Sequence, residues 1–216
     1  MKKQSRRRST RGMATWLKVV LIAAGLCFLG LIGMGIFVFL GYQQLTNPVK
    51  VRETANLFMT ISDPLPSGFN FAWGGNFMDS PFVVIVSPEN KAAYTFFSLP
   101  QSANTTIVTT PEELVGKIAK EGQAPSSPGI ASAKKLKVSS QGTLNIGDQK
   151  MPYAIGHGDQ AGNGGGTVDN VFCGSIKSST SGKLVLLMVQ SIDLGPTAKP
   201  MTIETVKKLT DSITKF

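Results

Sequence analysis

Apolar residues form one unbroken run near the start of the chain and a periodic pattern after it. Residues 19–42 carry no charged side chain over 24 positions. A helix of that length is roughly 36 Å long, more than the hydrocarbon core of a bilayer at about 30 Å. A secretion signal has a shorter apolar part, about 7 to 15 residues, before a small-x-small cleavage site. The run therefore predicts a retained transmembrane helix, with a cleaved signal as the alternative.

Helical spacing follows this run. Asn47 and Pro48 form a typical helix start, with a capping side chain before a proline at the first helical position. A helix over 48–62 is predicted because apolar residues then recur three or four positions apart, at Val51, Ala55, Phe58 and Ile61. Pro64 and Pro66 would end this helix.

The pattern then changes to strand-like alternation between residues 69 and 191, interrupted by one helical segment. The strand-like segments are FNFAW, FVVIV, AAYTFFSL, KKLKVSSQGTLNI, KMPYAIGHG, TVDNVFCGSIKS and KLVLLMVQSI. The linkers SPENK, GDQ and STSG are short enough for hairpins. Between the strand-like segments AAYTFFSL and KKLKVSSQGTLNI, the segment TPEELVGKIAKEG predicts a helix that Thr110 caps and Gly122 ends.

A second amphipathic helix is predicted over 202–215, capped by Thr202. Its apolar face consists of Ile203, Val206, Leu209 and Ile213. About six strands joined by hairpins and bracketed by helices predict an α+β domain, an antiparallel sheet covered by helices. We expect this single domain to span residues 43–216, with the sheet and its inserted helix over 69–191.

This order of elements resembles the PsbP/Mog1-like fold. The entry DPLPSGF and the closing helix after a long apolar strand are similar to domains of bacterial single-pass membrane proteins of unknown function. The resemblance covers roughly residues 49–216. It implies a binding or assembly role and no particular chemistry, because the fold hosts unrelated functions.

Positive charge is concentrated at the start of the chain. Residues 1–18 contain seven of the 22 Lys and Arg residues and no acidic residue, so 15 basic side chains remain against 13 acidic ones. Basic flanks stay in the cytoplasm, which predicts a cytoplasmic tail and a domain on the other side of the cell membrane, periplasmic or extracellular. The tail can also attract anionic lipid. The nearly balanced remainder gives no sign of nucleic-acid binding.

Two cysteines occur, Cys27 within the apolar run and Cys173 within a strand-like segment. They cannot plausibly meet, so no disulfide is predicted. Cys173 is flanked by apolar residues and is expected to be a buried thiol. A catalytic nucleophile is the alternative, with His157 and Asp159 as base and orienting residue.

The most site-like stretch is GHGDQAGNGGGTVDN, residues 156–170, which contains His157, the only histidine. It lacks the Gly-Lys-Ser/Thr of a phosphate-binding loop. As a calcium loop it has Ala161 at position three and Asn170 at position twelve, where a glutamate is needed. We predict a flexible hairpin loop without metal or cofactor.

Residues of this stretch remain candidates for a functional loop, and they are His157, Asp159, Asn163 and Asp169. The last three are also the candidates for ion binding, since their side chains carry oxygen ligands. The sequence therefore predicts a non-enzymatic, membrane-anchored domain that binds a protein partner in the envelope and contacts lipid through residues 19–42 and the tail. An enzyme that uses this loop with Cys173, and a ligand or ion sensor, are the alternatives.

Overall fold

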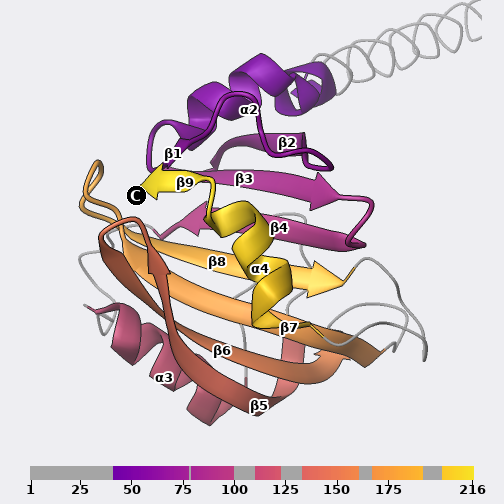
Figure 1. The fold of residues 1–216 in the computed structure, drawn as a ribbon, viewed down its shortest axis with the longest axis vertical. Coiled ribbons are helices and arrows are strands. Elements are labelled where there is room, and N and C mark those ends of the chain that lie inside the picture. Colours follow the sequence, from indigo (N-terminus) through magenta and orange to yellow (C-terminus); the bar gives the residue numbers. More distant parts are fainter. Residues whose placement is uncertain (1–40, 78, 100–109, 123–132, 161–166, 192–200) are drawn as a thin grey trace, which may run out of the picture. The chain divides into compact units, whose positions relative to one another are not determined.

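The computed structural model describes residues 41–77, 79–99, 110–122, 133–160, 167–191 and 201–216 (Figure 1). The chain divides into two compact units, Met1–Gln44 and Leu45–Phe216. Residues 41–44 are the described part of the first unit, and they are helical. The predicted tail and nearly all of the predicted membrane helix, residues 19–42, lie outside the described residues.

Within the described ranges, no helix has both the length and the apolar character needed to cross a membrane.

The second unit is α+β, as predicted, and its main sheet has seven strands where about six were expected. All strand pairs in this sheet are antiparallel, in the order β2-β3-β4-β8-β7-β6-β5 (Figure 1). The strands are β2 (Asn70–Phe77), β3 (Ser80–Ser87), β4 (Ala92–Ser98), β5 (Ala133–Ile146), β6 (Gln149–Gln160), β7 (Thr167–Lys177) and β8 (Leu184–Ser191).

The three hairpins that the short linkers predict are confirmed. β3 pairs with β4, β5 with β6, and β7 with β8. The strand expected over FNFAW, residues 69–73, continues as β2 through Gly74 and Gly75 to Phe77. A Cβ on Gly74 would lie 2.9 Å from the Phe82 carbonyl oxygen of β3, so this close approach of two backbones requires glycine.

Helices α2 (Pro48–Ala55), α3 (Pro111–Glu121) and α4 (Ile203–Thr210) pack on the sheet. The larger buried cluster unites α2, α4 and one face of the sheet, and includes Phe58, Tyr94, Phe96, Phe172, Leu209 and Phe216. The smaller cluster unites α3 with the other face, and includes Leu114, Ile118, Leu136, Val171 and Cys173. The sheet is therefore apolar on both faces, which explains why β3 and β8 are nearly continuous hydrophobic runs.

Local capping signals place the helix starts correctly. The Asn47 side chain accepts a hydrogen bond from the Val49 N–H at 3.0 Å, and Thr110 accepts one from the Glu113 N–H at 3.2 Å. Gly122 ends α3 in the left-handed region with φ 64°. Thr202 caps α4 in the same way as Thr110 caps α3.

Two helices are shorter than predicted. The helix expected over 48–62 ends at Ala55, and the one expected over 202–215 ends at Thr210. The residues that follow each helix form β1 (Thr60–Ile61) and β9 (Ile213–Lys215), which pair with each other antiparallel. Ile61 and Ile213 fit helical spacing equally well, but both are buried as strand residues in the larger cluster.

Candidate functional site

His157 lies on β6, with an exposed side chain, and not in a loop. Its register partner on β5 is Lys137, which is exposed as well. On the other side of β6, the register with β7 shifts between Gly156 and Gly158. Such a shift marks a β-bulge, a feature that often lies beside functional residues and re-aims a side chain.

The predicted loop over 156–170 is shorter than expected, because strand pairing extends into both of its ends. β6 continues to Gln160 and β7 begins at Thr167, with Asp159 and Thr167 as register partners. Asp169 also lies within β7, and Asn163 lies outside the described residues. The described residues contain no group of three or more His, Cys, Asp or Glu side chains arranged to hold a metal ion.

Cys173 is fully buried on β7, in the cluster beneath α3, as the apolar flanks predict. Burial in apolar surroundings disfavours the charged thiolate and raises the pKa of Cys173 to about 12. A nucleophilic cysteine needs a low pKa and some access to water. The position of Cys173 therefore disfavours its use as a nucleophile.

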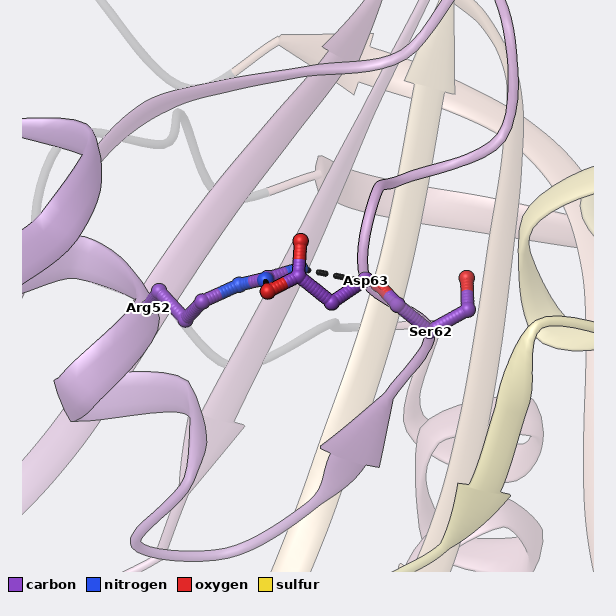
Figure 2. Close-up of polar contacts among 3 residues, drawn as sticks. All are labelled: Arg52, Ser62 and Asp63. Atoms are coloured by element: carbon purple, nitrogen blue, oxygen red, sulfur yellow. Dashed lines mark hydrogen bonds and ion pairs between the residues drawn. The ribbon is translucent and has the colours of Figure 1, made fainter.

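Arg52 on α2 makes a polar contact that the sequence pattern does not reveal (Figure 2). Its Nη2 donates to the Ser62 carbonyl oxygen at 2.8 Å, and its Nη1 forms an ion pair with the Asp63 carboxylate. The guanidinium also lies over the ring of Phe71, 5.6 Å from its centre. A basic residue in α2 eleven positions before an aspartate was the available signal, but spacing alone does not bring the two together.

These three contacts make Arg52 a clamp between α2, the segment after β1, and strand β2. The Arg52 side chain is 22% exposed and that of Asp63 is 77% exposed, so water screens the charge of the ion pair. The hydrogen bond and the ring contact therefore supply most of the stabilisation. The clamp positions α2 and has no geometry for chemistry on a substrate.

Strand β5 forms one edge of the sheet. It is 14 residues long, and β6 is the one strand that pairs with it in this sheet among the described residues. Its first half contains two register shifts, between Lys134 and Lys137 and between Val138 and Ser140. Beyond them the register is regular, residues 141–143 and Asn145 are exposed, and Leu144 is buried, so this part of the edge is accessible.

No protein-family model matches this chain, and no curated protein matches it either. Among solved structures, the chain is similar to the apo immunity protein TplEi of T6SS from Pseudomonas aeruginosa, with 13% identity and a TM-score of 0.35. The match covers 68% of this chain and 45% of that one. A structure of TplEi complexed with "L" peptide matches at 12% identity and a TM-score of 0.34, covering 76% of this chain and 61% of that one. The chain thus spans less than two thirds of either TplEi chain, and likeness at this level establishes neither family nor function.

The resemblance to PsbP/Mog1-like domains stays a prediction.

Proposed function

We propose that the protein is a membrane-anchored module that binds a protein partner in the envelope, or supports an assembly there, without catalysing a reaction. Residues 19–42 serve as the anchor, residues 1–18 stay in the cytoplasm, and the domain from residue 43 onward lies on the other side of the cell membrane. The length of the uncharged run and the basic tail before it support this topology.

The observation that carries the binding role is the accessible edge of β5. An edge strand presents a row of backbone N–H and C=O groups that accept an additional strand. Extended peptides bind many domains in this way, with backbone hydrogen bonds giving affinity and alternate side chains giving specificity. The bulges in the first half of β5 confine such pairing to the second half, from Gln141 to Asn145.

The position of Cys173 supports the absence of catalysis. The thiol is the strongest nucleophile that the domain sequence offers, and it lies inside the core with a raised pKa. The Tyr94 hydroxyl likewise serves the fold by bonding to α4. Anchoring raises the effective concentration of a binding surface at the membrane, which suits a binding module.

The topology is tested by alkaline extraction of membranes that contain the full-length protein, followed by protease digestion from each side. We expect the intact chain to stay with the membrane and its domain to be digested only from outside the cytoplasm. A soluble species that starts after the apolar run would contradict the anchor.

The binding role is tested by placing a photo-crosslinking amino acid at Thr143 on the β5 edge of the full-length protein. The matched control carries the same group at the exposed Glu204 on α4, and a second control retains only residues 1–44. We expect a crosslinked partner at Thr143 that neither control captures. Identical patterns at Thr143 and Glu204 would contradict binding at this edge.

A further inference from the structure

Exposed apolar side chains gather at the start of the domain. Within the described ranges, the large hydrophobic residues with high exposure all fall between residues 42 and 57. In the second unit these are Val49 at 66%, Leu57 at 53% and Leu45 at 37%. Single exposed apolar residues are ordinary, but their confinement to one short segment is not.

The two faces of α2 explain this exposure. Val51, Ala55 and Phe58 point into the core, and Phe58 follows α2 in a turn that keeps helical hydrogen bonding, from the Met59 N–H to the Ala55 carbonyl oxygen at 2.9 Å. Val49 and Leu57 are eight positions apart, so they share the opposite side of the helix. They form an outward apolar stripe, which also contains the exposed Glu53 between them.

The position of this stripe along the chain indicates what covers it. The apolar run of residues 19–42 ends at Tyr42, only three residues before Leu45 and seven before Val49. Residues 41–46 and 48–55 are helical, so Val49 lies roughly 10 Å along the chain from the end of the run. The polar interface of a bilayer begins where the hydrocarbon core ends. Because the chain between Tyr42 and Val49 is so short, an anchor that ends at Tyr42 would keep α2 beside this interface.

We propose that α2 and the turn after it lie at the membrane interface, with Val49 and Leu57 among the lipid headgroups on the outer surface of the cell membrane. This inference rests on the anchor of the proposed function. Amphipathic helices lie in this plane with their apolar face partly immersed and basic side chains beside it. The exposed Lys50 is such a side chain, while Glu53 keeps the stripe at headgroup level and out of the hydrocarbon.

The test uses full-length protein with Cys27→Ser, reconstituted in vesicles of equimolar phosphatidylcholine and phosphatidylglycerol. An environment-sensitive fluorophore is attached at Leu57→Cys or, in a second variant, at Val49→Cys, while the buried Cys173 stays unlabelled. Thr143→Cys on the β5 edge is the matched exposed control. Lipids with a nitroxide in the headgroup region act as the quencher, and alkaline extraction reports anchoring in every sample.

We expect the protein to stay in the vesicles during alkaline extraction. The fluorophore at positions 49 and 57 should show blue-shifted emission and be quenched by the lipids about twofold or more strongly than at position 143. Adding Val49→Asp to the Leu57→Cys protein should lower quenching toward the control. Retained protein with quenching at 49 and 57 no stronger than at 143 would overturn the inference while leaving the anchor intact. Blue-shifted emission without lipid quenching would also overturn it, because a second copy of the chain would then cover the stripe. Release of the protein by alkali would overturn the anchor and this inference together.

Discussion

Tyr94 on β4 donates a hydrogen bond of 2.6 Å from its hydroxyl to the backbone carbonyl oxygen of Thr205 in α4. The two residues are 111 positions apart, and the Tyr94 side chain is fully buried. This bond holds the last helix against the centre of the sheet. Its removal would leave a carbonyl oxygen of α4 without this donor at the edge of the core.

Tyr94→Phe should therefore lower the free energy of unfolding by about 1–2 kcal/mol, measured by urea denaturation of the full-length protein in detergent. Tyr153→Phe is the matched control, because that ring is only partly buried and stacks on Phe172. We expect the control to change stability by less than the Tyr94 variant. Equal effects would show that the bond to Thr205 contributes nothing specific.

Arg52→Met keeps the aliphatic stem but removes the hydrogen bond to Ser62 and the contact with the Phe71 ring. We expect a loss of about 1–2 kcal/mol in unfolding free energy, from a charge-assisted bond and a cation–π contact. Asp63→Asn should cost less than about 0.5 kcal/mol, since that carboxylate is mostly exposed. Equal losses in the two variants would instead assign the energy to the ion pair.

Cys173 should resist alkylation in the native protein. Iodoacetamide should modify it at neutral pH only after denaturant is added, because the buried thiol has a pKa of about 12 and no access to reagent. The Leu57→Cys variant provides an exposed thiol for comparison within the same chain. Rapid labelling of Cys173 in the native protein at pH 7 would instead support the hypothesis that Cys173 is a nucleophile.

Alkaline pH should destabilise the fold. The pKa of Cys173 is raised from 9.0 to about 12 by burial, and burial raises the pKa of Tyr94 as well. The unfolded chain then loses these protons at lower pH than the folded chain, so the free energy of unfolding falls as pH rises above about 9. Below that pH neither group contributes to the pH dependence. Cys173→Ala should flatten the fall between pH 9 and pH 12, as followed by thermal denaturation.

Gly116 within α3 and Gly122 just after it should respond to alanine in opposite directions. A Cβ on Gly116 would meet no atom within 4 Å, so Gly116→Ala should stabilise the protein by up to about 1 kcal/mol through helix propensity. Gly122 has φ +64°, and Gly122→Ala should destabilise it by about 1 kcal/mol. Melting temperatures of the two variants measure both effects. A stabilising Gly122→Ala would contradict the left-handed helix end.

The starts of the helices could be predicted from the sequence because capping is local. Asn47, Thr110 and Thr202 act on N–H groups two or three residues away, so a short window contains the whole signal. The helix ends after Ala55 and Thr210 could not be predicted, since the strand pairing that replaces them joins Thr60 to Lys215. No local pattern records a partner 155 positions away.

The features of the candidate site could likewise be predicted only in part from the sequence. The burial of Cys173 follows from its apolar neighbours in the sequence, and the prediction is confirmed. The clamp of Arg52 on Ser62 and Phe71 depends on how α2 packs beside β2, which periodicity does not encode. The exposure of Val49 and Leu57 also escaped prediction, because a helical wheel identifies the buried face without showing whether a neighbour covers the other.

The pairing of β1 with β9 has a mechanical consequence. Thr60 opposes Lys215 and Ile61 opposes Ile213, so the chain enters β1 and leaves β9 at the same end of this short ladder. A force that pulls these two ends apart therefore unzips the ladder one bond at a time, and does not shear all its bonds together. Tension applied directly across these two ends would therefore open the β1–β9 ladder in sequence, starting from the Thr60–Lys215 pair.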